Sequence, residues 1–498
     1  MYRRSGSKRA SEGEPEKGSK LIAMEKRDYD AVVVGSGPNG LAAAITLQRE
    51  GLRVLLLEAR QTIGGGMRTE ALTLPGFRHD VCSAIHPMGI ASPFFQSVPL
   101  GDYGLEYVYP PVSAAHPFDD GTAAVLEGSV ADTARLLGAD EAVYKKLFNP
   151  IVDRWPDLVD DLLGPLGVPG HPLEFGLFGL KAMQPAVTLA RRFTTKEARG
   201  LFAGMAAHSI LPLNLLSTSA IGLVLTAVGH RYGWPLPKGG SDRIGAALEA
   251  YFRALGGTIE TNFYVRSLRQ LPSARAVLFD VTPRQLLEIA GERLSPFYRG
   301  QLQRYRYGMG VFKIDWALDN AIPFTAEGCR RAGTVHLGGT LEEIAYGEAQ
   351  SAKGHHPEKP FVLLAQQSLF DPTRAPEGKH TAWAYCHVPN GSDLDRTEII
   401  ERQVERFAPG FRERILGRHV MGPAQLEAYN ANYIGGDING GAIDIRQLFT
   451  RPALRSSPYR TSAKGLYLCS SSTPPGGGVH GMCGYHAARS ALKHTFGR

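Results

Sequence analysis

The sequence predicts an α/β fold in which a discontinuous Rossmann-like domain is interleaved with a second, α+β domain. Three glycine-rich segments, near residues 35, 239 and 476, support the prediction because each leads into a helical pattern. Such turns bring the backbone close to a bound anion at a helix N-terminus. The segments lie near the start, the middle and the end of the chain, so one domain must be built from three pieces. We predict a Rossmann-like domain of residues 28–110, 231–294 and 453–498, and a substrate or cap domain of residues 111–230 and 295–452.

The composition is that of a globular protein with large cores. Of the 498 residues, 43% are hydrophobic and 21% are charged, which excludes the disordered and fibrous classes. The 58 glycines follow no G-X-Y period, so we expect them in tight turns. The net charge of +7 is modest, and no basic stripe with interleaved aromatic residues indicates nucleic-acid binding.

The N-terminal residues 1–27 are polar and contain no apolar run of the kind that a secretory signal requires. We predict a disordered tail. A mitochondrial presequence is the alternative, against which Glu12, Glu14 and Glu16 count, because presequences are poor in acidic residues. The five cysteines form no C-x-x-C pair, which argues for a reducing compartment and against a disulfide frame or a zinc site. We therefore expect a cytoplasmic protein, with the mitochondrial matrix as the alternative.

The longest stretch without a formal charge, residues 200–230, is interrupted by Pro212, Asn214 and several hydroxyl residues. A membrane-spanning helix needs about 20 predominantly apolar residues. We predict instead a buried helix pair that lines an apolar cavity, with peripheral contact with a membrane as the alternative.

A βαβ unit is predicted at the start of the Rossmann-like domain. Its parts are a strand over 30–34, the segment Gly35-Ser-Gly37-Pro38-Asn39-Gly40, a helix over 41–50, a strand over 53–57 and then Glu58. This order of strand, glycine turn, helix, strand and acid is typical of a dinucleotide site.

Each part of this unit has a physical role. Gly35 permits the tight turn, Gly37 lets the backbone approach a pyrophosphate, and Gly40 lets the helix pack closely on the strand. Glu58 accepts hydrogen bonds from ribose hydroxyls. We therefore predict a dinucleotide at the N-terminus of this helix.

A second glycine cluster follows the acid, in the segment Glu58-Ala59-Arg60-Gln-Thr-Ile-Gly64-Gly65-Gly66-Met67-Arg68-Thr69. Its pattern, E-x-R-x-x-x-G-G-x-x-x-T, resembles that of the phytoene desaturase and carotenoid isomerase family, part of the amine-oxidase-like flavoprotein group. The resemblance implies FAD as the cofactor. The residues of the two N-terminal segments that we expect to hold it are Gly35, Gly37, Pro38, Asn39, Gly40, Glu58, Ala59, Arg60, Gly65, Gly66, Met67 and Arg68.

Two later segments fit the same domain. Pro237 to Ser241 lead into a helix predicted over 242–255, followed by strands over 258–261 and 264–268 and by an apolar strand over 276–280. The resemblance implies that Val265 lies against the adenine, although the sub-sheet is shorter here than is usual in the family.

At the C-terminus, a strand over 465–469 precedes a Gly/Pro loop and a helix over 480–493. A helix N-terminus suits the electron-rich edge of a flavin. The resemblance implies contacts with the flavin ring from Thr473, Gly478 and Val479.

The substrate domain combines helices predicted over 130–137, 142–163 and 180–192 with strands over 311–318 and 382–388. Its apolar helices favour a lipophilic substrate, although helices that merely form a core have the same pattern.

The catalytic residue that we predict is His480, which adjoins Val479, and His86 is a second candidate. Flavin chemistry often needs no protein acid or base, because N5 of the flavin accepts the hydride. No second βαβ unit with a G-x-G-x-x-G turn and no redox C-x-x-C occurs, which argues against a separate NAD(P)H domain and against thiol–disulfide chemistry.

The resemblance implies an FAD-dependent oxidoreductase that desaturates, saturates or isomerises C–C bonds in an apolar, isoprenoid- or lipid-like small molecule, with oxygen or a quinone as electron acceptor. One alternative is an amine or amino-acid oxidase on the same fold. The other is a non-catalytic FAD-binding regulatory scaffold, similar to the GDP-dissociation inhibitors. A homo-oligomer is compatible with the sequence.

Overall fold

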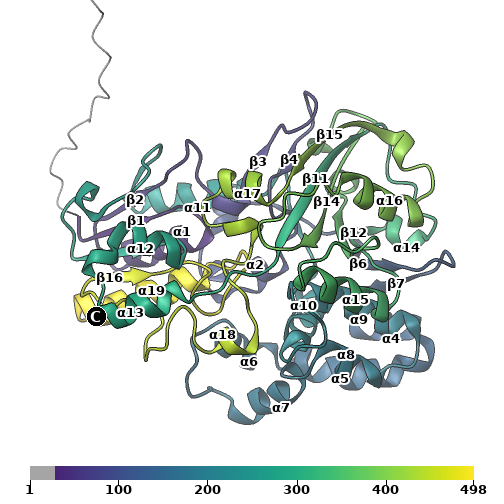
Figure 1. The fold of residues 1–498 in the computed structure, drawn as a ribbon, viewed down its shortest axis with the longest axis horizontal. Coiled ribbons are helices and arrows are strands. Elements are labelled where there is room, and N and C mark those ends of the chain that lie inside the picture. Colours follow the sequence, from purple (N-terminus) through teal and green to yellow (C-terminus); the bar gives the residue numbers. More distant parts are fainter. Residues whose placement is uncertain (1–28) are drawn as a thin grey trace, which may run out of the picture.

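The computed structural model describes residues 29–498 and shows two sheets side by side, each covered by helices (Figure 1). The disordered tail predicted for residues 1–27 lies outside the described residues. None of the helices within residues 29–498 combines the length and the apolar character that a membrane crossing requires.

The first sheet is parallel, with the strand order β16 (Leu466–Leu468), β10 (Ala276–Phe279), β1 (Ala31–Val34), β2 (Val54–Leu57), β9 (Thr258–Glu260). Its central strands are buried along their whole length because helices cover both faces, which explains their continuous apolar sequences. On one face, α1 (Pro38–Arg49) packs against α11 (Asp242–Ala254) and α19 (Met482–Ala491). On the other face lie α12 (Pro283–Ala290) and α13 (Pro296–Gln303). The predicted α/β fold with a Rossmann-like domain is confirmed.

One predicted strand of this region, over residues 264–268, is wrong. The backbone of Asn262 is left-handed, with φ of 58°, and its N–H and that of Phe263 bond to the carbonyls of Arg60 and Glu58. Ser267 then caps the short 3-10 helix Leu268–Gln270. The Gln270 side chain accepts the backbone N–H groups of Arg266 and Ser267, so local hydrogen bonds use the backbone groups that a strand would need.

The second sheet is mixed, with the strand order β15 (Ile415–Met421), β11 (Gly310–Leu318), β14 (His380–Val388), β13 (Val362–Ala365), β12 (Ala332–Leu337), β6 (Val112–Pro117), β7 (Ala123–Leu126). Only β12 and β6 pair in parallel among the strands of this sheet. One face packs against α16 (Thr397–Phe407) and α14 (Glu327–Arg330). The strands predicted over 311–318 and 382–388 are confirmed as β11 and β14.

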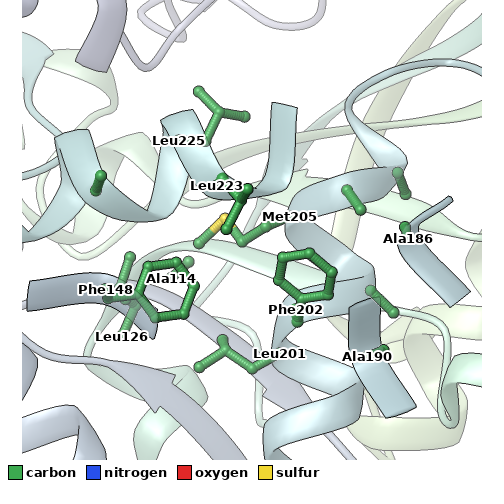
Figure 2. Packing of buried hydrophobic residues seen from close by; sticks show 14 of the residues in the cluster. Ala114, Leu126, Phe148, Ala186, Ala190, Leu201, Phe202, Met205, Leu223 and Leu225 are labelled. Carbon is green, nitrogen blue, oxygen red and sulfur yellow. The ribbon is translucent and has the colours of Figure 1, made fainter. Parts of the chain in front are cut away.

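A helical layer covers the other face of this sheet. It consists of α4 (Val130–Leu136), α5 (Glu141–Asp153), α6 (Trp155–Leu162), α7 (Pro172–Ala182), α8 (Ala186–Leu189), α9 (Lys196–Ala207), α10 (Thr218–Tyr232) and α15 (Leu341–Ala352). Helices α9 and α10 are the buried pair predicted in the charge-free stretch. Figure 2 shows Phe202 and Met205 of α9 in one apolar cluster with Leu223 and Leu225 of α10. Burial of such side chains contributes about 1.5–3 kcal/mol each to stability.

Two helix predictions in this layer need correction. The helix predicted over 142–163 is two helices, α5 and α6, because the chain turns at Arg154. The helix predicted over 180–192 is wrong. Pro185 lacks an N–H and disfavours a helical conformation at Gln184, so α7 ends at Ala182 and the short α8 begins at Ala186.

The strands of the first sheet come from residues 28–110, 231–294 and 453–498, and those of the second sheet from 111–230 and 295–452. The domain boundaries themselves stay a prediction. The remaining short strands and α-helices are β3 (Thr69–Glu70), β4 (His79–Asp80), β5 (Tyr107–Val108), β8 (Leu236–Pro237), α2 (Pro87–Ala91), α3 (Pro93–Gln96), α17 (Pro423–Tyr429) and α18 (Ile445–Leu448).

Candidate functional site

A cavity of about 1160 Å³ is lined by residues of both sheets and of the helical layer. Sites for one small ligand usually measure about 300–1,000 Å³, so the cavity is large enough for a cofactor and a substrate together. The ends of β1 and β2 line one part, at Val34 and Leu57, and the second sheet lines another, at Leu363 and Trp383.

The structure places most of the predicted cofactor residues on the wall of this cavity. Those residues are Gly35, Gly37, Pro38, Asn39, Glu58, Ala59, Arg60, Gly65, Gly66, Arg68, Val265, Gly478 and Val479, together with the predicted catalytic His480. Gly40, Met67 and Thr473 do not line it. Met67 is fully buried in the apolar core, and the Thr473 hydroxyl donates to the carbonyl of Ser470 at 2.8 Å. The middle glycine segment, residues 237–241, also lies behind the wall rather than on it.

Glycine is required at the turn before α1. A Cβ on Gly40 would lie 1.9 Å from the carbonyl oxygen of Gly35, which itself has φ of 100°. A Cβ on Gly65 would lie 3.0 Å from the Cα of Gly37, so the two glycine turns touch. Together they bring bare backbone to the N-terminus of α1, where an anion is favoured.

Glu58 is fixed by a set of short contacts. One carboxylate oxygen accepts from the backbone N–H of Ser36 at 3.0 Å, and the other from the backbone N–H of Arg60 at 2.9 Å and from the Arg68 guanidinium at 3.2 Å. Arg68 also donates to the carbonyl of Thr62 at 2.7 Å. Arg68 therefore orients the acid.

Asp280 is a functional candidate that sequence reasoning missed. It follows β10, lines the cavity, and accepts the backbone N–H of Gly40 at 3.0 Å. Burial, with a smaller contribution from Glu58, raises the pKa of this carboxyl to about 7. The sequence signal for Asp280 was an acidic residue directly after a buried strand, and the structure places it beside the glycine turn before α1. Because it can be neutral near pH 7, it is compatible with an anion at the same helix terminus.

His480 and His86 differ in what they offer the cavity. Nδ1 of His480 accepts the backbone N–H of Met482 at 3.0 Å. Nε2 of His86 lies 2.8 Å from the Ser241 hydroxyl, which itself donates to the carbonyl of Ser83. His86 must therefore donate from Nε2, and its buried Nδ1 has no partner among the described residues. Burial lowers the pKa of each histidine to about 4, so both are neutral at pH 7.

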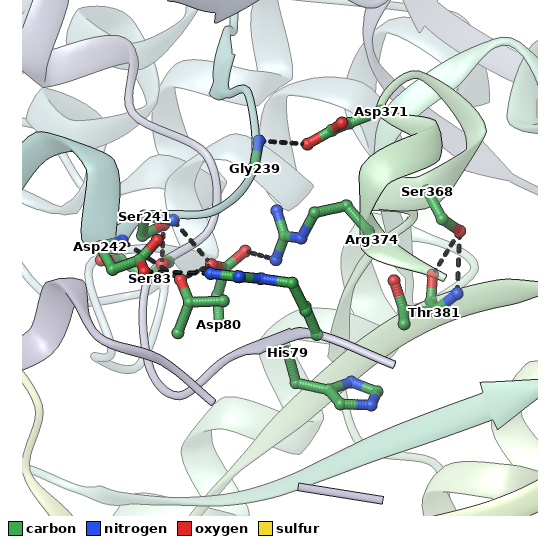
Figure 3. Close-up of polar contacts among 12 residues, drawn as sticks. His79, Asp80, Ser83, Gly239, Ser241, Asp242, Ser368, Asp371, Arg374 and Thr381 are labelled. Carbon is green, nitrogen blue, oxygen red and sulfur yellow. Dashed lines mark hydrogen bonds and ion pairs between the residues drawn. The ribbon is translucent and has the colours of Figure 1, made fainter. Parts of the chain in front are cut away.

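Ser241 connects His86 to a buried ion pair between the two parts of the molecule. Figure 3 shows this pair, Asp80 and Arg374. Asp80 of β4 and Arg374 are fully buried and lie 2.7 Å apart. The second oxygen of Asp80 accepts from the backbone N–H of Ser241, at the start of α11, and from the Thr69 hydroxyl. Burial alone would raise the pKa of Asp80, but Arg374 and these hydrogen bonds outweigh burial and hold the pKa below its ordinary value.

A protein with a parallel Rossmann-like sheet and a second mixed sheet beside one large cavity has the architecture of FAD-dependent oxidoreductase structures. Putrescine oxidase with bound putrescine superposes with a TM-score of 0.59 over 95% of this chain and 100% of its own, at 17% sequence identity. This likeness concerns the fold. A family model for an NAD(P)-binding Rossmann-like domain matches residues 33–97.

Relatives align along nearly the whole chain. Pyridine nucleotide-disulfide oxidoreductase domain-containing protein 2 of Rattus norvegicus is 26% identical over 94% of each chain. A limonene dehydrogenase component of Castellaniella defragrans is 24% identical over 94% of this chain and 95% of its own. A lycopene-forming phytoene desaturase of Paracoccus sp. is 23% identical over 91% and 95%. The chain is thus similar over nearly its whole length to oxidoreductases that include a phytoene desaturase.

Replacing Asp80 by Asn should lower the free energy of unfolding by about 3–5 kcal/mol, because Arg374 would remain buried without its counter-charge. The measurement is urea unfolding at pH 7. Since the pKa of Asp80 is lowered in the folded state, its stabilising contribution is complete above the unfolded pKa and is lost as the pH falls through the folded pKa. The difference in unfolding free energy between the wild type and Asp80→Asn should therefore decrease below about pH 4.

The matched control is Glu106→Gln, which removes one partner of an exposed ion pair with Lys238 and should leave the unfolding midpoint nearly unchanged. Equal midpoints for the wild type and Asp80→Asn would contradict the structural role of the buried pair.

Proposed function

We propose that the protein is an FAD-dependent oxidoreductase that desaturates, saturates or isomerises C–C bonds in an apolar small molecule. The observation that carries the proposal is the meeting of three glycine turns, near residues 35, 65 and 477, on the wall of one cavity that is otherwise mainly apolar. When bound, FAD supplies a two-electron acceptor.

The residues of the cavity fit this cofactor. The two touching glycine turns and the N-terminus of α1 suit a pyrophosphate, and Glu58 is already oriented toward the cavity for ribose hydroxyls. The buried side-chain oxygen of Asn39, on the same wall, has no partner within residues 29–498. Val479 and His480 line the cavity from the C-terminal loop, where the flavin ring is expected.

An apolar substrate fits the remaining wall. The helical layer contributes side chains such as Phe175, Phe178, Ile221, Val224 and Leu225. The acidic residues of the wall are Glu58, Asp161, Asp280 and Glu288, and none of them comes from the second sheet. Asp161 of α6 is the one acid that the helical layer contributes, and its carboxylate already accepts the backbone N–H of Gly170 at 3.0 Å. At the second sheet a cationic amine would lack a counter-charge, which favours C–C chemistry over the amine-oxidase alternative.

In a desaturation, two adjacent C–H bonds become a C=C bond. One hydrogen leaves with its bonding electron pair, the other leaves as a proton, and oxygen or a quinone finally takes the two electrons. The protein needs at most one proton acceptor. The His86 side chain is neutral and its Nδ1 has no partner among the described residues. Nδ1 of His480, in contrast, already accepts a hydrogen bond from the backbone N–H of Met482. The geometry therefore favours His86 over His480 for this role.

The test is visible absorption of the purified protein under anaerobic conditions, with geranylgeraniol and with benzylamine as probes. We expect flavin bands that bleach with the isoprenoid, persist with the amine, and return when air or decylubiquinone is admitted. Bleaching by the amine alone would favour the amine oxidase, and a colourless protein that FAD cannot reconstitute would favour the non-catalytic scaffold.

Peripheral membrane contact is the second part of the proposal, and α7 supports it. Leu173, Leu177 and Leu180 lie on one helical face and are 69%, 54% and 72% exposed. The opposite side of α7, at Phe175 and Phe178, lines the cavity. Figure 1 shows α7 at the outer edge of the molecule.

Cations border this apolar face. Lys181 lies in the last turn of α7, and its pKa is lowered by burial and by the neighbouring Arg192. Two neighbouring like charges suit anionic headgroups. An apolar substrate dissolved in the bilayer would then enter beside α7.

The measurement for this part is flotation with phosphatidylcholine/phosphatidylglycerol vesicles. We expect the wild type to float and the triple variant Leu173→Ser, Leu177→Ser, Leu180→Ser to lose most of its binding. Leu136→Ser is the control, because Leu136 is 59% exposed elsewhere in the helical layer. Equal flotation of all three proteins would refute the contact through α7.

A further inference from the structure

Where the second sheet meets the helical layer, the cavity wall contains a small group of uncharged polar side chains. Thr334 and His208 both line the cavity, and His336 stands behind His208. Their neighbours on the wall are apolar or aromatic: Leu225, Trp234, Leu363 and Trp383. An isolated polar group on such a wall fixes the orientation of a ligand in many binding sites.

Thr334 presents a hydroxyl that no atom of the described chain satisfies. The side chain is 1% exposed, and its Oγ1 has no hydrogen-bond partner there. In the sheet register it lies beside Ala114 of β6 and Ala365 of β13, two side chains that cannot form a hydrogen bond with it. A buried hydroxyl without a partner is costly, so a polar ligand atom at this point would be stabilised.

The two histidines determine which ring atom of His208 is free. Their Nε2 atoms lie 2.9 Å apart, so one of the two carries the proton between them. Nδ1 of His336 faces α9 and has no partner among residues 29–498, and a Cβ on Gly204 would lie 2.7 Å from it. A buried N–H without a partner is rarer than an unused lone pair, so the hydrogen-bond network assigns the shared proton to His336. His208 then carries its own proton on Nδ1.

Both rings are uncharged at physiological pH. Burial lowers the pKa of His208 to about 3 and holds that of His336 well below its ordinary value. The subsite thus offers neutral donors, and its apolar and aromatic neighbours on the wall include no cation that would balance a carboxylate.

We propose that Thr334 and His208 form a subsite for a single uncharged oxygen function, a hydroxyl or a carbonyl, on an otherwise apolar substrate. The inference rests on the proposed function and narrows its substrate class from hydrocarbons to oxygenated isoprenoid or lipid molecules. A hydrocarbon would leave the Thr334 hydroxyl unpaired, whereas an alcohol or an aldehyde would satisfy it.

The test compares farnesol with β-farnesene, which share a carbon skeleton although only farnesol carries a hydroxyl. Binding to the full chain is followed by tryptophan fluorescence, because Trp234 and Trp383 line the cavity. We expect the wild type to bind farnesol about tenfold more tightly than farnesene. Thr334→Val should lose most of this preference without changing the farnesene affinity, and Thr334→Ser should keep it.

The matched control is Thr381→Val. Thr381 is also 1% exposed and its hydroxyl oxygen also lacks a partner in the described part of the chain, but it does not line the cavity. It should retain the full preference for farnesol. Equal affinities of the wild type for the two probes, no binding of either, or an unchanged preference in Thr334→Val would overturn the subsite. The binding titration needs no turnover. The subsite proposal can therefore fail although a substrate reduces the flavin, and it can hold in a protein whose flavin no substrate reduces.

Discussion

The buried ion pair of Asp80 and Arg374 is the constraint on which the shape of the cavity depends. The pair joins a short strand of the Rossmann-like part to a turn that follows β13 of the second sheet. The same carboxylate holds the start of α11 through Ser241, and Ser241 in turn holds His86 on the cavity wall. Fully buried charges are tolerated only when they are paired and hydrogen-bonded, so these contacts form together. The relative position of the two sheets is thereby coupled to the geometry of the site.

A second constraint is the close approach of backbone at the glycine turns. The room for a side chain at Gly40 is already occupied by the carbonyl of Gly35. This requirement explains why the sequence predicts the cofactor end of the cavity well: the residue types and their spacing follow from local sterics. The βαβ unit and the C-terminal strand, loop and helix were predictable for that reason.

Other features depend on contacts between segments distant in the chain, which spacing does not reveal. Asp280 gains its raised pKa only because β10 lies beside β1. His208 and His336 are 128 positions apart and meet only when α9 covers β12. The strand predicted at 264–268 failed because Ser267 and Gln270 satisfy the backbone locally. The apolar periodicity predicted the helical layer. It did not predict the break at Pro185 or the exposure of the three leucines of α7 to solvent.

The central claim is that the glycine turns near residues 35, 65 and 477 form one FAD site. The most direct measurement is chromatographic identification of the nucleotide released when the purified protein is denatured. The account predicts one FAD per chain, retained through gel filtration before denaturation. Release of NAD or NADP instead, or a chain that contains no nucleotide and does not retain added FAD, would contradict it.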